Sequence, residues 1–214
     1  MPDQITLFFI IEIAGTIAFA CSGAMVAVRK QLDLLGIIVL GVTTAVGGGM
    51  LRDLLIGIQP PTLFVKPVYV TAAFLSVVLL FLIIKSHSLS LETLESELYE
   101  RAMNLLDAIG LGAFTVVGID TAIEAGFQEY RFLMVFLGVI TGVGGGILRD
   151  IMAGQTPAVL KKHVYACASI AGAVCYVALQ GKISNDIAMV SSAVLVVIIR
   201  VLARKYRWNL PKAL

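Results

Sequence analysis

Hydrophobic residues along the chain fall into seven long runs, separated by short polar or proline-containing segments. The runs cover about residues 5–28, 34–58, 67–84, 103–123, 132–154, 164–179 and 187–202. An α-helix rises 1.5 Å per residue, so about 20 apolar residues cross the roughly 30 Å hydrocarbon core of a bilayer. The pattern therefore predicts an all-α membrane protein with seven transmembrane helices, in a single transmembrane domain covering residues 1–214.

The second and fifth runs contain the same string, Gly-Gly-Gly-x-Leu-Arg-Asp, once at residues 47–53 and again at 144–150. The two strings are offset by 97 residues, and Glu12 corresponds to Asp107 at the similar offset of 95. The likeness therefore extends over three spans in each half of the chain. Since three is an odd number, the second half enters the membrane from the opposite face. This predicts an inverted-topology repeat, an architecture typical of transport proteins.

These boundaries divide the chain into four parts. They are a first three-helix repeat (5–84), a polar linker (85–101), a second three-helix repeat (103–180) and a seventh helix (186–203). Eleven Lys and Arg residues lie in the first, third and fifth connections and the C-terminal segment, against three on the other side. Because cytoplasmic loops carry the excess of positive charge, we expect the N-terminus outside and the C-terminus in the cytoplasm.

The glycine triplets lie near the middle of their spans. Three adjacent glycines weaken a helix by roughly 1 kcal/mol each relative to alanine. Gly47, Gly48 and Gly49, and likewise Gly144, Gly145 and Gly146, are therefore expected to break helices 2 and 5 and to turn carbonyl oxygens toward a pore. Thr44 and Thr141 could add hydroxyl groups to its wall or, as an equal alternative, form hydrogen bonds between helices. The alternative is close helix packing, which glycine also permits.

An Arg-Asp pair follows each triplet inside its span: Arg52 with Asp53, and Arg149 with Asp150. Ionisable residues at such depth indicate function, although long side chains can also reach the headgroups as structural anchors. Judged by depth along the helices, the expected partners are Glu12 for Arg52 and Asp107 for Arg149. The adjacent aspartates are weaker candidates, because consecutive side chains on a helix do not face each other.

The sequence shows no nucleophile–base pair, no metal-ligand spacing and no phosphate-binding loop. It therefore predicts neither an enzyme nor a cofactor or nucleic-acid binder, and no metal beyond transient K⁺ or Na⁺. Its apolar residues, 59% of the chain, point to membrane lipids as its surroundings.

The doubled glycine motif in a seven-span chain with two three-helix repeats resembles the trimeric intracellular cation channel family, in its prokaryotic branch. The resemblance implies a homotrimer in the prokaryotic inner membrane, in which each subunit has its own pore for K⁺ and similar monovalent cations. It also implies kinks at 47–49 and 144–146 that shape the pore. The alternative is a secondary transporter for a small zwitterion such as glycine, since inverted repeats with broken helices suit alternating access equally well.

Overall fold

The computed structural model describes residues 7–86, 96–161 and 164–208, and the regular secondary structure in these ranges is helical. The helices are α1 (Leu7–Arg29), α2 (Leu34–Leu55), α3 (Thr62–Val65), α4 (Val68–Ser86), α6 (Glu97–Glu124), α7 (Arg131–Met152), α8 (Ala158–Lys161), α9 (Tyr165–Leu179) and α10 (Asn185–Lys205). Within the described ranges six helices are long and apolar enough to cross a membrane, and the 15-residue α9 is a shorter apolar helix. Six of the seven predicted spans thus reach full length.

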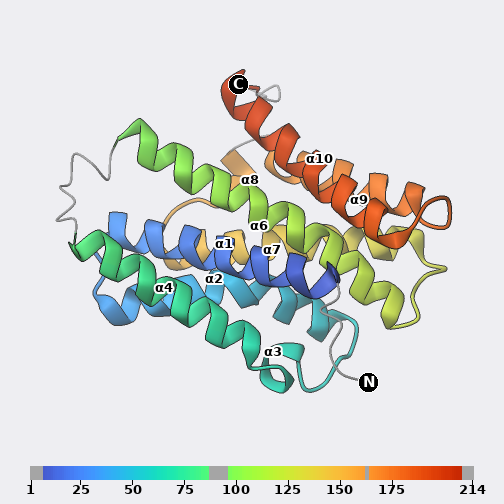
Figure 1. Ribbon diagram of the computed structural model, residues 1–214, viewed down its shortest axis with the longest axis horizontal. Helices are drawn as coiled ribbons and strands as arrows, with labels where there is room; N and C mark the ends of the chain where they lie inside the picture. The colour runs from blue at the N-terminus through green and yellow to red at the C-terminus, as the bar shows by residue number, and fades with distance from the viewer. Residues whose placement is uncertain (1–6, 87–95, 162–163, 209–214) are drawn as a thin grey trace.

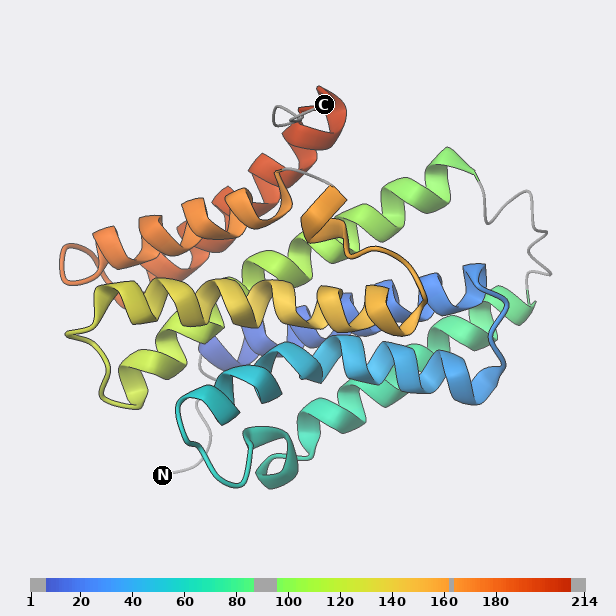
Figure 2. The same cartoon turned by 180° about the vertical axis from the view of Figure 1, so that it is seen from behind.

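Four helices form the centre of the molecule: α1 packs against α2 and α6, and α7 packs against the same two helices. Helix α4 covers α1 and α2, whereas α9 and α10 pack against each other and against α6 (Figure 1). Helices α2 and α7 lie side by side and run in opposite directions (Figure 2). Their C-terminal ends, which carry the Arg-Asp pairs, therefore point to opposite ends of the bundle.

Local sequence explains where several helices begin and end. The side chains of Asp33, Ser96 and Ser184 accept hydrogen bonds from the first turns of α2, α6 and α10, as N-cap residues do. After α2 and α7 the chain passes through Gly57 at φ 75° and Gly154 at φ 65°. These left-handed conformations favour glycine and stop both helices short of the predicted ends at 58 and 154.

The polar linker predicted at 85–101 is shorter than expected at its second end, because α6 already begins at Glu97. Residues 87–95 of that linker lie outside the described residues. The sequence pattern also gave no sign of α3 and α8, two single-turn helices of four residues each. They follow α2 and α7 respectively, after the proline-containing segments.

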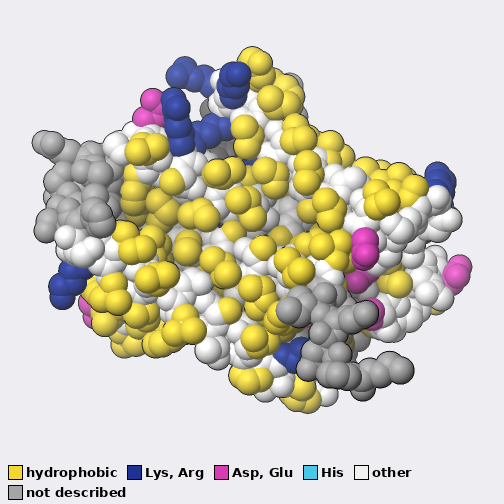
Figure 3. Space-filling view, viewed as in Figure 1, with side chains coloured by type: hydrophobic (Ala, Val, Ile, Leu, Met, Phe, Trp, Pro, Cys, Tyr) yellow, Lys and Arg dark blue, Asp and Glu magenta, His cyan; other side chains and the backbone are white. Residues whose placement is uncertain are grey.

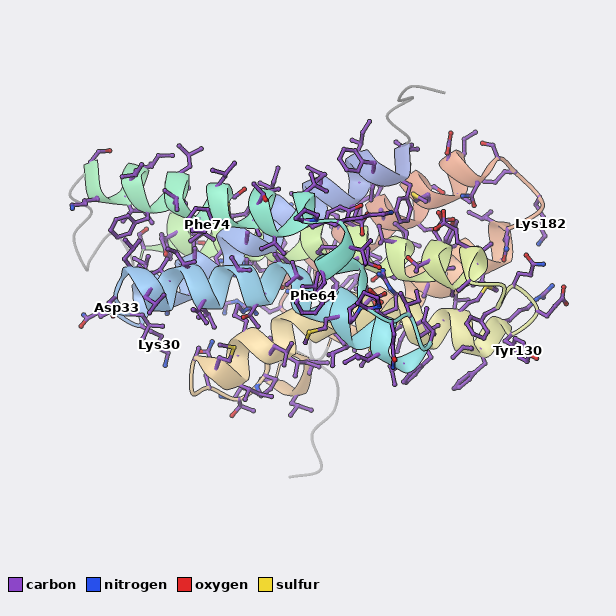
Figure 4. All side chains as sticks on the ribbon, turned by 90° about the horizontal axis from the view of Figure 1, so that it is seen from below. Lys30, Asp33, Phe64, Phe74, Tyr130 and Lys182 are labelled. Carbon is purple, nitrogen blue, oxygen red and sulfur yellow. The ribbon has the colours of Figure 1, made fainter. Side chains whose placement is uncertain are left out.

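The centre of the bundle is filled by small and aromatic side chains, such as Phe19 and Phe114, whose ring centroids lie 5.4 Å apart. Hydrophobic side chains also cover the middle of the surface, and the charged groups gather toward its ends (Figure 3). Lys30 and Asp33 lie at one end of the bundle, and Tyr130 and Lys182 at the other (Figure 4). This is the distribution expected for helices that cross a bilayer.

Candidate functional site

Both glycine triplets lie in uninterrupted α-helix: residues 47–49 inside α2 and residues 144–146 inside α7. The expected break at each triplet is therefore wrong for the described structure. The physical reason is the bilayer around the helices. A carbonyl group released from its helix there has no water molecule to bind, so the helix keeps its backbone hydrogen bonds. The alternative interpretation, close packing, is the one that the geometry favours.

The triplets mark the crossing of α2 and α7. A Cβ atom added at Gly48 would overlap the carbonyl oxygen of Thr141, and one added at Gly145 would overlap the carbonyl oxygen of Thr44. The two backbones therefore approach each other as closely as only glycine allows. The contact is reciprocal, with each helix placing its middle glycine on the threonine carbonyl of the other.

The threonines take part in this packing and do not line an open wall. Thr44 and Thr141 are both fully buried, and their hydroxyl groups donate to carbonyl oxygens one turn earlier in their own helices. A Cβ at Gly23 would overlap the hydroxyl oxygen of Thr44, and one at Gly118 that of Thr141. Each threonine thus fills a hollow that a glycine leaves on the neighbouring α1 or α6.

The third glycine of each triplet has a different environment. A Cβ at Gly49 would meet only Arg52, whose Nη2 lies 3.7 Å away, and a Cβ at Gly146 would meet the hydroxyl of Tyr165 and Nη2 of Arg149. The first two glycines therefore pack the helices together. The third leaves room for the arginine side chain that follows one turn later.

Arg149 lies at the centre of a buried polar group. Its Nη1 donates to Asp107 Oδ1 at 2.6 Å and to the hydroxyl of Ser22 at 2.8 Å, and its Nε donates to Asp150 Oδ1 at 2.9 Å. The predicted Asp107–Arg149 ion pair is therefore present in the structure. Arg149 is only 5% exposed, so the interpretation as an anchor that reaches the headgroups does not apply.

A second arginine completes this group from α10. Arg200 places Nη2 3.6 Å from Asp107 Oδ2 and its guanidinium carbon 4.5 Å from the centre of the Tyr165 ring, a cation–π distance. The Tyr165 hydroxyl donates to Asp107 Oδ1 at 3.3 Å. The side chains of the Arg149 cluster, as we call it, are Ser22, Asp107, Arg149, Asp150, Tyr165 and Arg200.

The corresponding group near the opposite end, the Arg52 cluster, consists of Glu12, Arg52, Asp53 and Tyr69. Here the predicted Glu12–Arg52 ion pair is wrong: in the described residues Arg52 binds Asp53, with Nη2 2.7 Å from Oδ1. Tyr69 lines the same cavity as Glu12, and Glu12 Oε2 has no hydrogen-bond partner among the described residues. A buried acceptor without a partner is unfavourable by roughly 1–3 kcal/mol, and more when charged.

Asp53 and Asp150 are more important than their positions in the sequence suggested. Each accepts the Nε of the preceding arginine at 2.9 Å, because the long arginine side chain bends back along the end of its helix. The second carboxylate oxygens accept the backbone N–H of Thr62 at 2.7 Å and of Ala158 at 2.6 Å, at the starts of α3 and α8. Each aspartate thus holds an arginine and fixes the short helix that follows.

Four participants were missed in the sequence: Ser22, Tyr69, Tyr165 and Arg200. Tyr69 and Tyr165 stand in the matching strings Lys-Pro-Val-Tyr (66–69) and Lys-His-Val-Tyr (162–165), a repeat signal that could have identified both. Arg200 offered no such signal, because α10 lies outside the two repeats. It was counted among the cytoplasmic charges, whereas the structure buries it to 8% exposure.

Cavities reach both clusters. One of about 510 Å³ opens between the ends of α1, α6, α7 and α8 and is lined by Arg149 and Asp150, with Arg29, Lys30 and Glu100 nearer the surface. The other, of about 30 Å³, is lined by all members of the Arg52 cluster together with Gly49. The four central helices thus hold polar, partly hollow regions at two depths.

The chain matches a protein-family model described as glycine transporter, over residues 9–85 and again over residues 104–181. It is 36% identical to the UPF0126 membrane protein YvgT of Bacillus subtilis (strain 168), covering 94% of each chain. It is 33% identical to the UPF0126 inner membrane protein YadS of Escherichia coli (strain K12), covering 95% of this chain and 94% of that one.

Solved structures resemble it over nearly the whole length. A TRIC cation channel studied for its conductance is 35% identical, with a TM-score of 0.82 and 96% of both chains covered. The TRIC trimeric intracellular cation channel orthologue from Rhodobacter sphaeroides is 30% identical, with a TM-score of 0.84. That alignment covers 95% of this chain and 100% of the orthologue.

Proposed function

Because the chain belongs to the prokaryotic branch of the trimeric intracellular cation channel family, we propose that it is a channel that passes K⁺ and similar monovalent cations through a pore in each subunit. The observation that carries this proposal is the likeness to solved cation channels at TM-scores of 0.82 and 0.84. The protein is an integral membrane protein of the inner membrane, as its relatives' names and the six long apolar helices among its described residues indicate.

We place the pore between α1, α2, α6 and α7. Two observations support this path: the cavity of about 510 Å³ lies beside α1, α6 and α7 and the cavity of about 30 Å³ beside α1, α2 and α6, and both are lined by carboxylates. The packed glycines at 47–48 and 144–145 hold α2 against α7 and so fix one wall of the path. Arg52 and Arg149 are each neutralised by an aspartate, which limits their repulsion of a passing cation.

Three such subunits form a homotrimer in this proposal, as the names of the similar channels state for those proteins. Exposed hydrophobic residues along α4, such as Phe74 and Leu79, would contact lipid or a neighbouring subunit. Each pore then lies inside one subunit, so that the trimer carries three parallel paths.

Unitary currents are the direct test of the proposed channel. Purified protein in a planar bilayer between KCl solutions is expected to give discrete openings, with no coupling ion or counter-substrate required. In vesicles that hold a K⁺ gradient, a potential-sensitive dye should report a diffusion potential. Saturable glycine uptake without unitary currents would instead support the transporter that the family model is named for. The likeness to solved channels favours the currents.

We also propose that the two repeats are inverted, with the N-terminus outside and the C-terminus in the cytoplasm. The family model matches the chain twice, and α2 and α7 run in opposite directions, in support of this arrangement (Figure 2). Lys182→Cys should then react with an impermeant maleimide on intact cells, and Lys30→Cys only after permeabilisation. The chain with its three native cysteines, Cys21, Cys167 and Cys175, sets the background. The reverse labelling pattern would contradict the orientation.

A further inference from the structure

Glu12 carries a buried carboxylate oxygen that nothing in the described structure satisfies. The residue is 7% exposed, and its Oε2 has no hydrogen-bond partner. Arg52 does not form an ion pair with it, because Asp53 takes that guanidinium at 2.7 Å. Buried carboxylate oxygens normally have a cation or a hydrogen-bond donor as a partner. An oxygen without one therefore indicates that a ligand from outside the chain binds beside it.

The space beside Glu12 has the size of one small ion. The cavity lined by Glu12, Thr16 and Tyr69 measures about 30 Å³, and the Arg52–Asp53 ion pair lines it as well. Roughly 10–15 Å³ suffices for a single water molecule, and a dehydrated K⁺ has about the radius of a water molecule. The hydroxyl groups of Thr16 and Tyr69 supply oxygen atoms of the type that bind alkali cations.

The buried charges of the two clusters differ in a way that favours a cation only at Glu12. In the Arg149 cluster, Asp107 and Asp150 are matched by Arg149 and by Arg200 from α10. In the Arg52 cluster, Glu12 and Asp53 share the single Arg52, which leaves one uncompensated negative charge if both acids are ionised. Lys66 also attracts the Glu12 carboxylate, but it is exposed and its charge is screened by water.

We therefore propose that Glu12 Oε2, with the hydroxyl groups of Thr16 and Tyr69, forms a binding site for one partly dehydrated monovalent cation. This inference deepens the proposed channel function and rests on it, since the site lies on the path proposed for permeation. The seventh helix explains the asymmetry: only the second repeat receives an arginine from α10. The cation takes at Glu12 the place that Arg200 takes at Asp107.

Thallium(I) is the probe for this site, because it resembles K⁺ in size and scatters X-rays anomalously. Crystals grown with thallium nitrate in place of potassium salts are expected to show an anomalous peak next to Glu12. The peak should disappear in Glu12→Gln, which keeps the shape and the hydrogen-bonding ability of the side chain. It should persist in Asp120→Asn, a control that alters a buried acid held by Tyr176 and Asn185 instead.

A solution measurement covers the case in which a variant does not crystallise. A bound cation stabilises the folded protein by mass action, so replacing choline chloride by KCl at constant ionic strength should raise the melting temperature. The rise should be lost in Glu12→Gln and reduced in Tyr69→Phe, which retains the ring next to Phe9. Asp120→Asn should keep it.

The outcomes separate this site from the channel itself. No thallium peak in the wild-type protein, or an unchanged peak in Glu12→Gln, would overturn the site, even if the wild-type protein gives unitary K⁺ currents. An occupied site in a protein that gives no currents would support the site and count against the channel. A K⁺-dependent rise in melting temperature that survives in Glu12→Gln would also overturn the proposal.

Discussion

Alanine at Gly48 or Gly145 is expected to force α2 away from α7 and to lower both stability and conductance. The new Cβ would overlap the carbonyl oxygen of Thr141 or Thr44, which belongs to the backbone and cannot rotate away. Inserting a methyl group into such a contact is typically unfavourable by about 1–3 kcal/mol. The measurement is thermal or denaturant unfolding in detergent, together with unitary currents, for each variant and for the double variant.

Gly49→Ala is the matched control, because it changes the same triplet in the same helix. Its Cβ would meet only the Nη2 of Arg52 at 3.7 Å, an ordinary van der Waals distance. The stability of this variant should therefore stay close to that of the wild-type protein. If all three substitutions raised the stability alike, as the higher helix propensity of alanine predicts, the crossing would not explain the triplet.

The second large effect is expected for Arg149→Gln. This change leaves Asp107 and Asp150 without their strongest donor, and Arg149 is only 5% exposed. Removing one partner of a buried ion pair is typically unfavourable by about 3–5 kcal/mol, since the remaining charge stays out of water. Arg200 can compensate only in part, because its Nη2 lies 3.6 Å from Asp107. The free energy of unfolding measures the loss.

Arg101→Gln removes the same chemical group from an exposed pair and serves as the control. Arg101 and Glu97 lie on the first turns of α6, with side chains 65% and 74% exposed. Such surface pairs contribute about 0–1 kcal/mol. A loss of similar size in both variants would mean that the Arg149 cluster is no more than a solvated ion pair, contrary to its burial.

The glycine triplets show how a correct signal can receive the wrong interpretation. Helix propensities measured in water indicate that residues 47–49 and 144–146 weaken a helix, and from this a break was expected. In a bilayer the alternative to the helical hydrogen bond is no bond at all, so both helices continue through the triplets. What glycine supplies there is close approach of two backbones.

The ion pairs show the limit of reasoning from depth. Position along the helices placed Asp107 level with Arg149 and Glu12 level with Arg52, and only the first of these pairs is present in the described structure. Depth fixes one coordinate of a side chain and leaves the rotation of each helix undetermined. Arg52 pairs with Asp53 in place of Glu12, although side chains at consecutive positions on a helix usually diverge.

The sequence by itself determined the helical class, the approximate positions of the apolar helices and the doubled motif around which the site is built. These features depend on local composition and on chain length, which hydropathy and spacing record directly. Only the tertiary structure decided that the middle glycines bear on opposing threonine carbonyls, that Arg200 reaches Asp107, and that Glu12 is left without an ionic partner. Those facts depend on how helices distant in sequence are rotated and packed against one another, and α10 has no counterpart in the first half from which its contribution could be anticipated.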